Sequence, residues 1–189
     1  SSACIQGFEF ENTIHHSAFD LRDIAIADLD NDGDLDIIFA DYGDAFTPPP
    51  QNPGTSKVAW YRNIGSGAFS STEEIITESA VDYIGINSIA VADFDADGDL
   101  DVVRSDRWMG DILEFKNDGL GNFAQHWWIA TDSSQGCDHP MQLMAEDLNG
   151  NGHPDLIWRN DLNIGFIQNV NAGIWGLWSG AQILDLSAS

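Results

Sequence analysis

Short apolar segments separated by polar turns follow one another along the whole chain. The segments 24–27, 37–40 and 89–92 are each four residues long and rich in β-branched side chains. Runs of this length on either side of a turn are typical of a β-hairpin. No segment of useful length combines helical periodicity with helix caps, so the sequence predicts an all-β protein.

The predicted strands recur in units of about 50 residues with four strands each, which is typical of β-propeller blades. The first unit has predicted strands at 23–28, 36–41, 57–63 and 69–77. The second has them at 88–93, 101–105, 111–117 and 123–130, and the third at 142–147, 155–160, 163–169 and 175–185. We therefore predict one domain over 1–189 with three four-stranded antiparallel blades, at 23–80, 81–134 and 135–189.

The first hairpin of each unit is closed by a nine-residue loop of repeated design: DLDNDGDLD at 28–36, DFDADGDLD at 93–101 and DLNGNGHPD at 147–155. Oxygen-bearing side chains stand at positions 1, 3, 5 and 9, and position 7 can offer its main-chain carbonyl. Six or more hard oxygen ligands are what Ca²⁺ takes in proteins. A glycine at position 6 allows the sharp turn around an ion: Gly33, Gly98 and Gly152.

An EF-hand begins with the same pattern, but it needs a bidentate Glu at position 12 and helices on both sides. Position 12 is occupied here by Phe39, Arg104 and Trp158, and the flanking segments are strand-like. The loops are therefore not EF-hands. Solvated acidic turns are the alternative for an isolated loop, but three copies at the same place in a repeat favour calcium.

A second landmark lies downstream of each loop. Asn63, Asn117 and Asn169 are each followed by a glycine four residues later and by an aromatic residue six residues later. Asn and Gly tolerate the positive φ that a hairpin turn requires, so this segment is predicted to join the third and fourth strands.

Hairpins with such loops resemble the FG-GAP/VCBS repeat, the calcium-loop blade of integrin α-subunit propellers and of many secreted microbial proteins. The resemblance implies two strong Ca²⁺ sites and a third, weaker one, in which amides replace two carboxylates. Positions 34, 99 and 153 contribute main-chain carbonyls in this scheme. The implied ligands are Asp28, Asp30, Asp32, Asp34 and Asp36; Asp93, Asp95, Asp97, Asp99 and Asp101; and Asp147, Asn149, Asn151, His153 and Asp155.

One further strand is predicted in the N-terminal segment 1–22. A step of 24 residues back from the second and third loops reaches Phe69 and Phe123, and the same step from Asp28 reaches Cys4. Residues 5–15 thus take the place of an outer fourth strand. Closed propellers use about four to eight blades, so the structure is predicted to be incomplete or to be completed by another chain. A fragment of a longer propeller, a six-blade ring of two chains and a head-to-tail filament are the alternatives.

Charge and composition narrow the range of possible binding partners. The 31 acidic and seven basic residues give a net charge of −24, which excludes nucleic acid and anionic membranes as partners. No transmembrane segment is predicted, and the resemblance implies an extracellular or cell-surface location. Cys4 and Cys137 are either one disulfide or two free thiols. The Pro-rich insertion 46–54 is either a tolerated surface loop or a contact or O-glycosylation site.

The leading functional hypothesis is an extracellular, calcium-stabilised module for adhesion, structural support or self-assembly, with other subunits or extracellular proteins as partners. A carbohydrate-binding lectin is the alternative, because exposed tryptophan rings can stack on sugars, although most of the seven Trp are expected in the core. An enzyme is not predicted: no nucleophile-elbow, zinc-protease or P-loop motif occurs, and the five histidines are scattered.

Overall fold

The computed structural model describes residues 14, 20–43, 56–79, 85–130, 139–170 and 182–184. Within these ranges the chain forms twelve strands in three four-stranded antiparallel sheets. The predicted all-β fold of propeller-type blades is confirmed. The described segments contain no helix long and apolar enough to cross a membrane.

Each sheet is one blade, with its strands hydrogen-bonded in chain order. Blade 1 consists of β1 (Leu21–Ala27), β2 (Asp36–Asp41), β3 (Ser56–Tyr61) and β4 (Glu74–Ser79). Blade 2 consists of β5 (Ile86–Ala92), β6 (Asp101–Asp106), β7 (Ile112–Asn117) and β8 (Phe123–Ala130). Blade 3 consists of β9 (Gln142–Glu146), β10 (Asp155–Arg159), β11 (Ile164–Ile167) and β12 (Gln182–Leu184).

The fourth strand of blade 1 starts later than predicted, at Glu74 instead of residue 69. Phe69 forms only an isolated bridge with Asn63. After it the chain bends, and the Ser70 hydroxyl donates to the Thr72 carbonyl at 2.9 Å. A hydroxyl that bonds to nearby backbone competes with the sheet ladder, so strand pairing resumes only beyond this bend.

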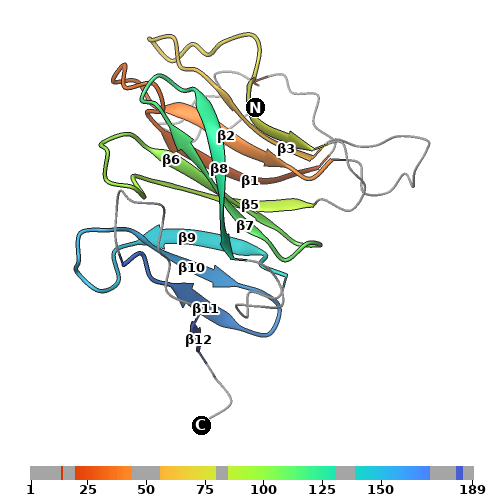
Figure 1. Ribbon diagram of the computed structural model, residues 1–189. Coiled ribbons are helices and arrows are strands. Elements are labelled where there is room, and N and C mark those ends of the chain that lie inside the picture. The colour runs from red at the N-terminus through yellow and green to blue at the C-terminus, as the bar shows by residue number, and fades with distance from the viewer. Residues whose placement is uncertain are drawn as a thin grey trace, which may run out of the picture.

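Blade 2 lies between the other two blades, as Figure 1 shows, because its inner strand β5 packs beside both β1 and β9. Apolar side chains fill both spaces between neighbouring blades. Trp60 is 1% exposed in the core between blades 1 and 2, and Trp158 is 0% exposed in the core between blades 2 and 3. Core packing is thus confirmed for these two rings, whereas Trp108 and Trp128 are exposed.

Several predicted features lie outside the described residues. These are the Pro-rich insertion 46–54, both cysteines (Cys4 and Cys137) and most of the extra strand at 5–15. Of that strand only Ile14 is described, and it packs against a small cluster of Phe39, Ala59 and Tyr61 on blade 1.

Candidate metal centres

The three acidic or amide-rich loops occupy the same place in each blade, between the first and second strands. In the first loop the Gly33 N–H donates to Asp28 Oδ2 at 2.9 Å, and Gly33 has a φ of 93°. A side chain at this φ would be strained, which explains the glycine at position 6. The corresponding bonds are 3.1 Å from Gly98 to Asp93 and 2.8 Å from Gly152 to Asp147.

The aspartate at position 9 joins each loop to the Asn turn of the same blade. Asp36 is 0% exposed, and its carboxylate accepts the N–H of Leu29 at 2.9 Å and the N–H of Asn63 at 2.8 Å. The same two bonds are made by the equivalent buried residues Asp101 and Asp155. The two landmarks of the repeat therefore form one structural unit within each blade.

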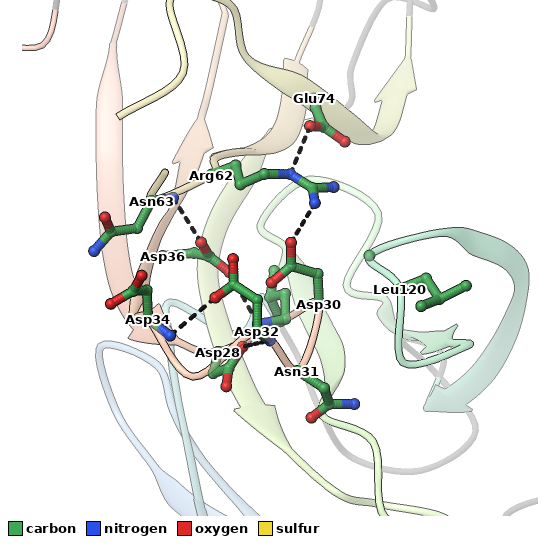
Figure 2. A network of polar contacts seen from close by, with 12 residues as sticks. Asp28, Asp30, Asn31, Asp32, Asp34, Asp36, Arg62, Asn63, Glu74 and Leu120 are labelled. Carbon is green, nitrogen blue, oxygen red and sulfur yellow. Dashed lines mark hydrogen bonds and ion pairs between the residues drawn. The ribbon is translucent and has the colours of Figure 1, made fainter. Parts of the chain in front are cut away.

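Carboxylates converge in the first loop. Oxygens of Asp28, Asp30 and Asp36 all lie within 4.8 Å of one another, and Figure 2 shows these side chains gathered with Asp32 inside the turn. Oxygens on opposite sides of a calcium ion, each at about 2.4 Å from it, are about 4.8 Å apart. The cluster therefore has the dimensions of a calcium site.

The second loop repeats this arrangement. Oxygens of Asp93, Asp95 and Asp101 also lie within 4.8 Å of one another. One oxygen in each loop, Asp30 Oδ1 and Asp93 Oδ1, is buried and has no hydrogen-bond partner. A buried carboxylate oxygen without a donor is costly unless a cation satisfies it. The donor set and these two orphaned oxygens both fit Ca²⁺.

The other predicted ligands of these loops lie on the turns themselves. Asp32 Oδ1 accepts the N–H of Asp34 at 2.9 Å, and Asp97 Oδ1 accepts the N–H of Asp99 at 3.0 Å. The two loops are also connected, because Asn31 Nδ2 donates to Asp99 Oδ1 at 2.8 Å. The two side chains at position 5 thus brace the turns, and the three-carboxylate clusters include neither position 5 nor position 7.

Two basic residues contact these loops and were not predicted from the sequence. Arg62 pairs with Asp30 and, at 3.4 Å, with Glu74 (Figure 2). Lys116 Nζ lies 2.6 Å from Asp95 Oδ2. Both stand directly before the Asn of the turn, where the third blade has Gln168. In blade 3 the residue before the Asn changes from a cation to an amide, and position 3 changes from Asp to Asn. This parallel change is the sequence signal that could have identified Arg62 and Lys116.

The third loop holds itself together with amides. Asn149 Nδ2 donates to Asp155 Oδ2 at 3.2 Å, where the first two loops have only carboxylates. Asn151 Nδ2 donates to the Asn169 carbonyl at 2.9 Å, and the His153 N–H donates to Asn151 Oδ1 at 2.8 Å. No cluster of three acidic or histidine ligands forms in this loop among the described residues.

The pKa shifts concern the position 9 aspartates of the first two loops and the position 1 aspartate of the third. Burial raises the pKa of Asp101 to about 7, and burial also raises the pKa of Asp36. In the third loop the hydrogen bond from the Gly152 N–H is the main reason that the pKa of Asp147 is lowered. The first two loops therefore bury negative charge that their own hydrogen bonds do not fully stabilise.

Four-stranded antiparallel blades whose first hairpins carry such loops define a β-propeller-type repeat protein. The FG-GAP-like repeat matches residues 28–104 and 97–158, which is more than half of the chain. The chain belongs to this family, whose repeats often bind calcium.

The structure is similar to that of an Agrocybe aegerita lectin that was solved to explain its specific recognition of non-reducing terminal N-acetylglucosamine. The TM-score is 0.54 and the sequence identity is 20%. The match covers 85% of this chain but 38% of the lectin, so the chain spans well under half of the lectin's length. At this identity the likeness establishes the fold alone. No curated protein matches the chain.

Proposed function

We propose that the chain is a non-enzymatic, extracellular module for adhesion or self-assembly whose blades are stabilised by two strongly bound calcium ions. The observation that carries the proposal is the pair of three-carboxylate clusters in equivalent loops, each with a buried oxygen that lacks a donor. The third loop binds calcium more weakly, since Asn149 and Asn151 replace two carboxylates and one of the amides already bonds to Asp155.

The residues in and beside each loop have different roles. The aspartates at positions 1, 3 and 9 would hold the ion, and its charge would offset their mutual repulsion. Asp36 and Asp101 also fasten the loop to the Asn turn through backbone N–H groups. Arg62 and Lys116 pair with the Oδ2 atoms of Asp30 and Asp95. The loops thus fix the hairpins, and the surfaces of the blades are left for binding.

Charge and calcium affinity support a place outside the cell. The net charge of −24 disfavours binding to nucleic acid and to anionic membranes. Extracellular calcium modules bind with dissociation constants of about 10⁻⁴ to 10⁻³ M, and the half-exposed first ligands Asp28 and Asp93 suit an affinity in that range. Carboxylates committed to an ion are not available for acid–base catalysis, which favours a binding protein over an enzyme.

Calcium binding measured by equilibrium dialysis tests the proposal. We expect two ions per native chain near millimolar calcium, and one ion per chain for Asp30→Ala and for Asp95→Ala. The matched substitution Asn149→Ala, at the same position of the third loop, should leave both strong sites intact. Absence of binding would contradict the calcium role, and submicromolar binding would contradict the extracellular assignment.

Glycan binding is the second candidate, and one exposed aromatic residue favours it. Trp108 is 56% exposed at the end of the blades opposite the acidic loops, and its Nε1–H donates to the Tyr42 hydroxyl. The Arg22 guanidinium lies 4.7 Å from the centre of the Tyr42 ring. A fixed, exposed indole beside polar groups suits stacking on a sugar, and the structurally similar protein is a lectin.

A glycan array in millimolar calcium tests this second candidate. Any signal should be lost in Trp108→Ala and kept in Trp128→Ala, because Trp128 is equally exposed, at 56%, on the outer strand β8. An array without any signal would contradict the lectin function.

A further inference from the structure

We propose that a second copy of this chain docks head to tail on the first, with blade 3 of one copy packed against blade 1 of the next. The inference deepens the self-assembly part of the proposed function and rests on it. We call the side of a blade that faces the preceding blade its leading face, and the side that faces the following blade its trailing face. Blade 1 has an open leading face and blade 3 an open trailing face, on opposite sides of the stack in Figure 1.

The leading face of blade 1 carries the same type of packing surface as the buried leading faces. Ile24 is 68% exposed, whereas its equivalents Ile89 in blade 2 and Leu143 in blade 3 are 5% and 4% exposed. Ile26, two residues further along β1, is 67% exposed, whereas its equivalent Val91 packs against the core between blades 1 and 2. The inner half of this face is therefore an apolar blade interface without a neighbour.

The trailing face of blade 3 is its counterpart. In blade 3 the cross-strand row of this face is Met144, Ile157 and Phe166. Met144 is 58% exposed, while its equivalent Ala90 in blade 2 is 6% exposed. Phe166 takes the place of Trp60, which is 1% exposed in the core between blades 1 and 2. In blade 3 Met144 is thus open, and Ile157 and Phe166 are partly exposed. Blade 2 has the buried Glu114 at the place of Phe166.

A repeated hydrogen bond between blades gives the docking its register. Asn117 Nδ2 donates to the Leu29 carbonyl of the preceding blade at 2.7 Å, and Asn169 Nδ2 donates to the Phe94 carbonyl at 2.7 Å. The equivalent Asn63 Nδ2 donates only to the Leu35 carbonyl of its own loop, at 3.0 Å, among the described residues. One donor proton on the leading face is therefore unused.

The matching acceptor lies at the other end of the molecule. Leu148 is the third-loop equivalent of Leu29 and Phe94, and its carbonyl accepts no hydrogen bond from the described part of the chain. A head-to-tail contact would pair Asn63 of one copy with Leu148 of the next. This hydrogen bond would then occur three times with the same geometry, twice within one chain and once between two copies.

Shape complementarity repeats as well. A Cβ added to Gly121 would lie 2.5 Å from Trp60 Cζ2. The turn of blade 2 therefore has no room for a side chain where the Trp60 ring of blade 1 covers it. At the equivalent Gly67 in blade 1 nothing lies within 4 Å of an added Cβ. Phe166 of a second copy, which stands where Trp60 stands in blade 1, has the position to cover this bare turn.

A second copy is the occupant because the two open faces complete each other and belong to the same chain. Ile14 covers the outer part of the leading face at Phe39 and Tyr61, so the contact is confined to the inner strand and the loop edge. The two surfaces differ, so the contact is heterologous and can extend to a closed ring or a filament.

Sedimentation of the full chain in millimolar calcium tests the proposal. At about 100 μM protein we expect particles of at least twice the 20.7 kDa chain mass. Ile24→Glu with Ile26→Glu removes the leading face, and Met144→Glu with Phe166→Glu removes the trailing face. Each double variant alone should be a monomer. A one-to-one mixture should form a heterodimer of twice the chain mass, because one intact face of each kind remains.

Other results would overturn the proposal. A face-to-face contact of two leading faces would leave the trailing-face variant associated on its own. A native chain that binds two calcium ions but stays monomeric would contradict the docking and leave the metal function intact, whereas loss of calcium binding would contradict the proposed function itself. Leu162→Glu, at a side chain 86% exposed in the turn between β10 and β11, is the matched control and should associate like the native chain. Serine versions of both double variants, melted in calcium, separate lost docking from lost folding.

Discussion

The first two loops and the third loop close the same hairpin in two different ways. All three share the bonds from position 6 to position 1 and from the Asn turn to position 9. In the first two loops position 3 is an aspartate that leaves buried carboxylate oxygens facing one another. In the third loop Asn149 places an amide hydrogen against Asp155 instead. The same loop backbone therefore carries a cluster of carboxylates in two blades and an internal amide bond in the third.

The comparison also extends to the residue before the Asn turn. Arg62 and Lys116 each pair with the aspartate at position 3, while the third blade has Gln168 at this place and Asn149 at position 3. The positive residue before the Asn and the negative residue at position 3 are thus present together in the first two blades and absent together in the third. The difference leads us to expect that the acidic loops depend on an external cation more than the third loop does.

Removal of calcium is expected to have the largest effect on this comparison. In about 10 mM calcium, which is 100 times a dissociation constant of about 10⁻⁴ M, each of two sites adds about 2.7 kcal/mol to the free energy of unfolding. The melting temperature should therefore fall by about 10–20 °C when this calcium is replaced by chelator. Thermal unfolding followed by circular dichroism measures this, with magnesium at the same concentration as the control. Identical melts in calcium and chelator would show that no loop depends on the ion.

The next largest effect concerns Glu114, which lies on β7 beside the second loop. Its equivalent in blade 3 is Phe166. Burial is the main reason that its pKa is raised to about 7. A carboxyl with a raised pKa in the folded state stabilises the protein below its unfolded pKa of about 4.5 and loses this stabilisation as the pH rises through 7. In chelator the ionisation of Glu114 alone should make the native chain less stable at pH 8 than at pH 5, by at most about 3 kcal/mol.

Glu114→Gln removes the titrating group and isolates its share of this pH dependence. In chelator the variant should melt several degrees above the native chain at pH 8 and close to it at pH 5. Melts of both proteins at a series of pH values measure the difference. A native chain that gains stability from pH 5 to pH 8 in parallel with the variant would contradict the assignment.

A smaller effect is expected when the second loop is given the position 3 residue of the third. Asp95→Asn removes one anionic ligand and leaves Lys116 without its partner. Calcium affinity at that site should fall about tenfold or more, which is about 1.4 kcal/mol, while the first site keeps its affinity. Isothermal titration calorimetry of the native chain and the variant measures both sites. Unchanged affinity at both would show that position 3 is not a ligand.

The strand layout could be predicted from the sequence because the loops mark the start of every blade. Ten of the twelve strands begin within two residues of the predicted start. The described part of β12 begins at Gln182, inside its predicted range, and β4 begins five residues late, where the hydroxyl of Ser70 bonds to nearby backbone and delays strand pairing. Such a local competition has no signature in the alternation of apolar and polar residues.

The candidate ligands could also be predicted from spacing, but their partners could not. Residues 30 and 62 are far apart in the sequence, and only the pairing of β2 with β3 brings Asp30 and Arg62 together. The amide bond from Asn149 to Asp155 depends in the same way on side-chain direction within a turn. Pattern therefore identifies the loop, whereas the side-chain pairs within it are seen only in the three-dimensional structure.

The reverse exchange, Asn149→Asp, should have the smallest effect and is the most direct test of the comparison. It removes the amide donor 3.2 Å from Asp155 Oδ2 and adds a negative charge beside it. In chelator the variant should lose about 1 kcal/mol, or a few degrees in melting temperature. Millimolar calcium should restore this loss, because the third loop would then have aspartates at positions 1, 3 and 9. Asn149→Ala separates the two contributions, since it loses the same bond without a new charge and should not be restored by calcium. Equal recovery of both variants would mean that calcium acts on the first two loops alone and that position 3 does not decide whether a loop binds the ion.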